Sequence, residues 1–94
     1  MKWSKKIDSN QNYIVDQLRK VPGVTVHVGV DDIFVGRQGK NFWFELKNPD
    51  AFKKNGKIKK GALKPSQIKL HDGWRGHYSI VSTLEEIVNE IFTT

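Results

Sequence analysis

The stretch VDDIFVGRQGKNFWFELKN, residues 30–48, constrains the fold more than any other part of the chain. Two apolar runs flank Gln38-Gly39, and such runs around a two-residue turn with glycine predict a β-hairpin. A two-residue turn fixes the pairing so that Asp32 faces Glu45, and a four-residue loop preserves that register. A three-residue loop with a bulge would shift it.

This register gathers charged side chains on one face of the hairpin. Asp32 and Glu45 become cross-strand neighbours with Cβ atoms about 5 Å apart, and Lys47 projects from the same face. Opposed like charges destabilise a sheet, and a hard divalent cation between carboxylate oxygens offsets that cost. A nearby lysine can stabilise negative charge on a phosphate, so the pattern favours metal-assisted phosphodiester cleavage. The alternative is a polar start of the strand at Asp31-Asp32, with Glu45 and Lys47 forming an exposed ion pair.

Composition narrows the class of partner. A chain of 94 residues is expected to form one domain, and the absence of cysteine excludes disulfides and thiolate metal sites. The net charge of +6 and pI near 9.7 favour a polyanionic partner such as nucleic acid, although charge for solubility alone is the alternative. No apolar run has the length of a membrane span or signal peptide, so we expect an intracellular protein without membrane contact. No histidine pair has the spacing of zinc ligands, so we expect no zinc.

Helical and extended patterns alternate along the rest of the chain. A loose start over 1–7 precedes a first helix that Asp8 and Gln11 are expected to cap. Ser82 and Glu85 are expected to cap the last helix. The strand after the second helix is expected to run parallel to a neighbour. The predicted order is αβββαβα, with helices over 8–21, 65–74 and 82–92, strands over 24–29, 32–37, 41–47 and 77–82, and a mobile basic loop over 48–64.

Side chains of the second helix and of the first strand give further candidates. Gln67, His71 and Trp74 share one helix face, on which we expect Gln67 beside the site and Trp74 in the core, with His71 undecided. His27 lies on the polar face of the first strand, where a surface or core role is favoured over catalysis. His77 has the sequence context of a turn residue.

The same motifs resemble a known family. VDDIFVGRQGKNFWFELKN resembles the core motif of the PD-(D/E)XK nuclease superfamily, and the wider pattern resembles its VRR-NUC family in the small stand-alone phage and bacterial form. DSNQNYIVDQLRKVPGV is similar to the opening helix, LKPSQIKLHDGWRG to the glutamine-bearing helix, and YSIVSTLEEIVNEI to the closing strand and helix. The resemblance covers residues 8–92. It implies one α/β domain over 1–94 with a restriction-endonuclease-like core, in which helices flank a mixed sheet.

The resemblance also implies an activity and assigns residues to it. The implied protein is a homodimeric endonuclease of bacterial or phage origin that requires Mg²⁺, or Mn²⁺ in its place, and cuts branched DNA such as four-way junctions. Asp32, Glu45 and the Leu46 carbonyl carry over as metal ligands, and Gln11 stands on the helix where many members place a glutamate. Lys47 and Gln67 complete the catalytic set. Asp31 replaces the proline of the motif, which affects local geometry.

Basic residues outside this set are candidates for contact with the nucleic-acid backbone. They are Lys53, Lys54, Lys57, Lys59, Lys60, Lys64, Lys69 and Arg75. The alternative for the loop lysines is a solvated connector. The alternative for the whole chain is a non-catalytic nucleic-acid-binding module on the same fold.

Overall fold

The computed structural model describes the backbone of residues 2–93 and the side chains of residues 10–93. Over this range the chain is a small α/β fold with three α-helices and one four-stranded mixed sheet. The elements are α1 Lys2–Arg19, β1 Val24–Val28, β2 Asp32–Arg37, β3 Lys40–Leu46, the 3₁₀ helix η1 Pro49–Ala51, α2 Pro65–Gly73, β4 Ser79–Val81 and α3 Leu84–Thr93. The order of helices and strands is the predicted αβββαβα, except that the short 3₁₀ helix η1 follows β3.

The sheet has the strand order β1-β2-β3-β4. β1, β2 and β3 are antiparallel neighbours, whereas β4 pairs parallel with β3, as expected for a strand that follows a crossover helix. Gln38 and Gly39 have φ values of 52° and 78°, which are the left-handed conformations of a type I′ hairpin turn. Asp32 therefore pairs with Glu45, and the predicted register is confirmed.

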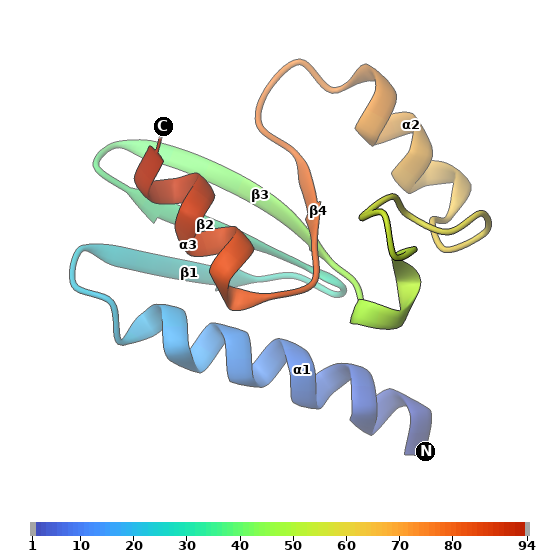
Figure 1. The fold of residues 1–94 in the computed structure, drawn as a ribbon. Coiled ribbons are helices and arrows are strands. Elements are labelled where there is room, and N and C mark those ends of the chain that lie inside the picture. The colour runs from blue at the N-terminus through green and yellow to red at the C-terminus, as the bar shows by residue number, and fades with distance from the viewer. Residues whose placement is uncertain (1, 94) are drawn as a thin grey trace.

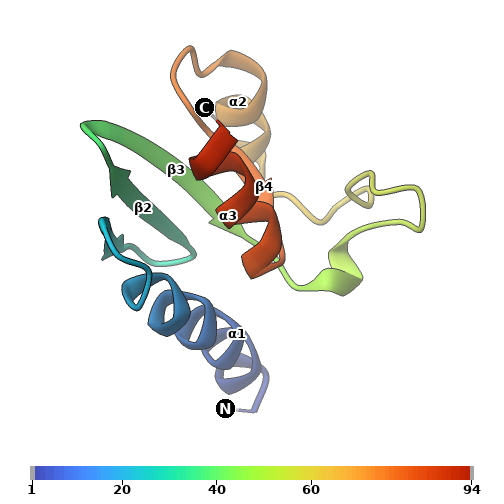
Figure 2. The ribbon, with the colours of Figure 1, turned by 60° about the vertical axis from the view of Figure 1, so that its left-hand side comes forward.

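One face of the sheet packs against two helices. α1 and α3 lie side by side on this face, while α2 stands apart from them beyond β4 (Figure 1, Figure 2). Alternate residues of the hairpin point into the core, as a half-buried sheet requires. The buried apolar residues are Ile14, Val15, Leu18, Val24, Ile33, Val35, Phe42, Phe44, Leu46, Val81, Ile87 and Ile91.

The N-terminal helix is longer than predicted. α1 begins at Lys2, so the expected loose start is wrong for residues 2–7, and residue 1 lies outside the described range. No proline or glycine interrupts this segment, and nothing else in it ends the helical pattern. Asp8 consequently lies inside the helix, and the predicted capping box with Gln11 does not mark its start. None of the helices over residues 2–93 has the length and hydropathy of a membrane span.

The cap of α3 lies one residue later than predicted. The Glu86 backbone N–H donates to Thr83 Oγ1 at 3.2 Å, and the Thr83 N–H donates to Glu86 Oε1 at 3.0 Å. Thr83 and Glu86 thus form the reciprocal capping box in place of Ser82 and Glu85. The Ser82 N–H also donates to Glu86 Oε1, at 2.8 Å.

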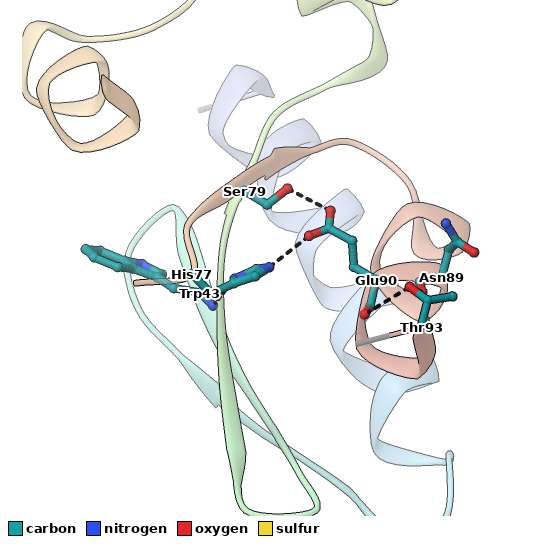
Figure 3. A network of polar contacts seen from close by, with 6 residues as sticks. All are labelled: Trp43, His77, Ser79, Asn89, Glu90 and Thr93. Atoms are coloured by element: carbon teal, nitrogen blue, oxygen red, sulfur yellow. Dashed lines mark hydrogen bonds and ion pairs between the residues drawn. The ribbon is translucent and has the colours of Figure 1, made fainter. Parts of the chain in front are cut away.

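A network of hydrogen bonds connects α3 to the β4 edge of the sheet (Figure 3). The Trp43 backbone N–H donates to His77 Nδ1 at 3.0 Å, so the proton of the neutral ring resides on Nε2 and faces Glu90 Oε1 at 2.8 Å. The Ser79 hydroxyl donates to Glu90 Oε2 at 2.7 Å. His77 lies in the connection after the bend at Gly76, as its sequence context predicted, and it is also a half-buried structural contact between β3 and α3.

The segment over 48–64 has more backbone order than its sequence predicts. It contains η1, a tight turn in which the Lys53 N–H donates to the Lys57 carbonyl at 2.7 Å, and a bridge between Phe52 and Ile58. The Lys59 N–H donates to the Ala51 carbonyl at 2.8 Å. These bonds fold the segment back on itself beside α2.

Candidate metal centre and nucleic-acid interface

Asp32 and Glu45 lie opposite each other on the sheet face away from α1 and α3. Their neighbours Ile33 and Phe44 are fully buried in the core, so the alternation of strand side chains turns the two carboxylates to the other face. Lys47 follows two residues after Glu45 and acts electrostatically on it. The predicted juxtaposition of two carboxylates and an ammonium is thus present.

Glu45 is the most buried acidic group of this face, with 4% of its surface exposed. Gln67 Nε2 donates to its Oε2 at 2.9 Å, and the Tyr78 hydroxyl donates to its Oε1 at 3.1 Å. Burial raises the pKa of the Glu45 carboxyl, while Tyr78 and Lys47 lower it and the nearby Asp32 and Asp31 charges raise it further. Burial and the Glu45 charge also raise the pKa of Tyr78, so its hydroxyl stays a donor.

Gln67 positions Glu45 and the start of α2 at the same time. Its Oε1 accepts the Lys64 backbone N–H at 2.9 Å while its Nε2 donates to Glu45. A carboxylate at this position could not donate, so the amide suits both contacts. Within α2, all of which the structure describes, Gln67 is the one buried residue. The predicted location of Gln67 beside the site is confirmed.

Asp32 is held by the neighbouring backbone and by an indole. Trp43 Nε1 donates to Asp32 Oδ2 at 2.8 Å, and the Gly29 N–H donates to the Asp32 carbonyl at 2.8 Å. A Cβ at Gly29 would collide with Asp32 Oδ1. Glycine at this position therefore leaves the space that the carboxylate occupies.

A cavity of about 310 Å³ adjoins the ends of β2 and β3. It is lined by residues from α1, from both ends of the hairpin and from the position just before α2, namely Asn10, Gln11, Asp31, Leu46, Lys47, Asn48 and Lys64. Gln11, Leu46 and Lys47 were predicted for the site. Asp31 was expected only to alter geometry, yet it lines the cavity and its Oδ2 lies 3.4 Å from Lys64 Nζ. The pair Asp31-Asp32 at the start of β2 is the sequence pattern that could have indicated a role for Asp31 at the cavity.

The donor set suits a hard, oxygen-liganded cation. The Leu46 N–H donates to the Asp31 carbonyl at 3.0 Å, so in this antiparallel pair the Leu46 carbonyl also faces β2. Together with Asp32 and Glu45 it would offer three oxygen ligands, and Mg²⁺ completes its octahedron with water. Among the described side chains no three acidic, histidine or cysteine groups meet as a metal cluster. Any cation here would depend on backbone, amide and water oxygens as well.

The predicted backbone-binding residues fall into two groups. Lys64 is brought to the cavity by its contact with Asp31. The others are exposed on the 48–64 segment, on α2 or just after it, and the structure does not bring them to the carboxylates. These are Lys53, Lys54, Lys57, Lys59, Lys60, Lys69 and Arg75.

Trp74 does not lie in the core, contrary to the prediction. Its surface is 51% exposed, and its ring meets Trp43 edge-on with centroids 5.2 Å apart. The reason is that α2 lies on the sheet face away from α1 and α3, where Trp74 packs edge-on against Trp43 and keeps its outer side in solvent. His71 is exposed beside Asp72, and His27 is exposed beside Phe34.

Comparisons of the chain with protein-family models, curated proteins and solved structures found no match. The resemblance to VRR-NUC nucleases consequently rests on the sequence motifs, and remains a hypothesis. The chemistry that the site can perform has to be inferred from its own residues.

Proposed function

We propose that this protein is a divalent-metal-dependent DNA endonuclease with a VRR-NUC-type PD-(D/E)XK core. The observation that carries the proposal is the register that opposes Asp32 and Glu45, with Lys47 beside them and a cavity at the end of both strands. Carboxylates opposed on one sheet face cost stability, and a bound cation would offset this cost.

Each residue of the site has a role that its chemistry allows. Asp32, Glu45 and the Leu46 carbonyl would hold Mg²⁺ or Mn²⁺, with Gln11 as a contact for a bound water. The cation, when bound, supplies Lewis-acid activation of the phosphate and of water. Lys47 stabilises charge that develops on the phosphate oxygens. Gln67 and Tyr78 are positioning residues, because they fix both oxygens of Glu45.

Asp31 and Lys64 add a feature that the family motif does not assign. The ammonium of Lys64 lies 3.4 Å from Asp31 Oδ2, and its side chain is 67% exposed. An exposed pair of this kind is weak and can exchange partners. Lys64 can therefore turn from Asp31 to an incoming phosphate at the cavity without a large cost.

The substrate proposed is DNA, in branched form. The net charge of +6 and the exposed lysines of the 48–64 segment and α2 support a polyanionic substrate. A domain of this size has little surface with which to read a long base sequence, so selection by DNA structure is favoured. In a homodimer, two sites related by a two-fold axis would nick opposing strands.

A nicking assay on linear, flapped and four-way DNA with Mg²⁺ or Mn²⁺ tests the proposal. Glu45→Ala should abolish cleavage and leave DNA binding largely intact, because the phosphate contacts come from lysines elsewhere. Glu85→Ala, which removes an exposed carboxylate of α3, is the matched control and should cleave normally. Cleavage by purified Glu45→Ala protein, or no cleavage of any substrate by the natural sequence, would falsify the proposal.

One observation favours a second candidate, a non-catalytic nucleic-acid-binding module. Both oxygens of Glu45 accept hydrogen bonds from neutral donors, and none of the buried polar side-chain atoms that the structure describes lacks a partner. The network is thus satisfied without a cation. Tight DNA binding together with no calorimetric signal for Mg²⁺ would select this candidate.

A further inference from the structure

A row of aromatic side chains crosses the sheet face that bears the carboxylates. We call it the aromatic strip and define it as His27, Phe34, Trp43, Trp74 and Tyr78. His27 pairs with Phe34, and Phe34 with Trp43, in the strand register. The Phe34 and Trp43 rings stack at 5.2 Å and 18°, and Trp43 meets Tyr78 at 4.8 Å and Trp74 at 5.2 Å, both edge-on.

The strip is open to solvent at both ends. Phe34 is 39% exposed and Trp74 51%, whereas the rings of Phe42 and Phe44 on the opposite face are buried beneath α1 and α3. A contiguous exposed apolar patch on a small domain marks an interaction surface.

Two hydrogen bonds connect the strip to the candidate metal centre. Trp43 Nε1 donates to Asp32 Oδ2 at 2.8 Å, and the Tyr78 hydroxyl donates to Glu45 Oε1 at 3.1 Å. The rings in the middle of the strip therefore touch both carboxylates directly. Whatever lies on the strip lies beside the position proposed for the scissile phosphate.

We propose that the aromatic strip binds unpaired nucleobases of a DNA strand, by stacking on Phe34 and Trp74 next to the cleavage site. This inference rests on the proposed function and names its substrate more closely. Aromatic side chains stack on any unpaired base, whereas the bases of a duplex are already stacked on one another. The strip would thus favour substrates with single-stranded nucleotides at a branch, a flap or an opened junction.

Charge and geometry favour DNA over a second copy of the chain as the occupant. The exposed Arg75 follows Trp74 directly, and the exposed Lys69 lies on α2. Both can contact the backbone of a strand whose bases lie on the rings. A second copy seated on the strip would cover the carboxylates that a nuclease must leave accessible to DNA.

Binding of a labelled oligothymidylate of about ten nucleotides, in EDTA so that no cleavage occurs, tests the inference. Phe34→Leu and Trp74→Leu should each weaken single-strand affinity roughly five- to hundredfold, with a much smaller change for a duplex of equal length. Phe34→Tyr keeps the ring and should retain affinity. Tyr13→Leu is the matched control, because Tyr13 is a 58% exposed aromatic of α1 on the opposite side of the sheet.

The outcomes separate this inference from the proposed function. Unchanged single-strand affinity in both leucine variants, with folding confirmed by circular dichroism, overturns the strip as a base-binding surface. A shift from dimer to monomer in Phe34→Leu with unchanged affinity overturns it in favour of a second copy. If the variants lose single-strand affinity while the natural sequence cuts no DNA, the strip is supported and the nuclease proposal fails.

Discussion

The two faces of the sheet are built from the same strands but carry different kinds of side chain. Ile33 and Phe44 face α1 and α3 and are fully buried, whereas their neighbours Asp32, Phe34 and Glu45 face the other way. The first face is apolar and closed by two helices. The second is polar and aromatic, and α2 is held to it by the Gln67–Glu45 hydrogen bond and the Trp74–Trp43 contact.

Because of this difference, neighbouring residues of one strand serve different purposes: one stabilises the core and the next belongs to the candidate site. A period of two lets one hairpin contribute a core residue and a site residue alternately. The closed face supplies the apolar burial that a small domain needs. The open face can then hold groups that oppose stability, such as a buried carboxylate next to another. Substitutions on the two faces test this division, and the largest effect is expected in the core.

Phe44→Ala should destabilise the fold by about 3–5 kcal/mol, because it leaves a cavity in the closed face. Phe34→Ala on the open face should cost about 1 kcal/mol or less, since that ring is 39% exposed and already contacts water. Urea denaturation of both variants at neutral pH measures the two free energies of unfolding. Equal losses would show that the open face contributes to the core as much as the closed one.

Lys47→Ala should lower the cleavage rate about a hundredfold or more, because it removes stabilisation of charge on the phosphate. Metal affinity should change little, since an ammonium does not bind a cation. Asp32→Ala, by contrast, should lose the metal. Calorimetric titration with Mn²⁺ measures both variants, and an equal loss of metal in the two would contradict this division of roles.

The buried Glu45 carboxyl on the open face should make the stability of the fold depend on pH. A carboxyl whose folded-state pKa is raised binds its proton more tightly in the folded than in the unfolded chain. The free energy of unfolding should therefore fall as pH rises from the ordinary Glu45 value of 4.5 through the raised folded pKa. Urea midpoints measured in EDTA should show this decline for the natural sequence and a weaker one for Glu45→Gln. A parallel pH dependence of the two proteins would show that Glu45 is not the group responsible.

Local rules made the closed face and the hairpin predictable from sequence. The alternation over β2 and β3 together with Gln38-Gly39 determines the register, because a slip of one residue would turn Ile33 and Phe44 to solvent. The parallel pairing of β4 follows from the helix that precedes it. The location of Gln67 beside the carboxylates was also predicted, from its helix face together with the resemblance to a family.

The features that the sequence did not predict depend on tertiary contacts, or on a choice between adjacent residues that suit the same role equally well. Ser82 and Thr83 are equivalent as caps by chemistry, and the choice is decided by where Glu86 reaches back to Thr83. Trp74 was assigned to the core from its helix face, but α2 packs on the sheet face away from α1 and α3, where the indole stays half exposed. The contact of Asp31 with Lys64 joins residues 33 positions apart, for which no local pattern exists.

The smallest expected effect concerns the 48–64 segment, which lies outside both faces. Replacing Lys57, Lys59 and Lys60 together by Ala should weaken DNA binding across sequences. The slope of log affinity against log salt should fall by roughly one unit for each phosphate that these lysines no longer neutralise. The bridge between Phe52 and Ile58 depends on backbone bonds, so the fold of the segment should survive. The rate at saturating DNA should change much less than affinity, because none of these exposed side chains is proposed to touch the reacting group.

A matched control separates this local effect from a loss of net charge. Lys20 and Lys40 are exposed lysines at the end of α1 and at the hairpin turn, and neither was proposed to contact DNA. Replacing both by Ala should leave the salt slope nearly unchanged, whereas the triple variant should flatten it. If the control flattens the slope as much per lysine removed, DNA is attracted by overall charge alone. Contacts to the DNA backbone would then have to come from Lys64, Lys69 and Arg75, which lie just before α2, within it and just after it.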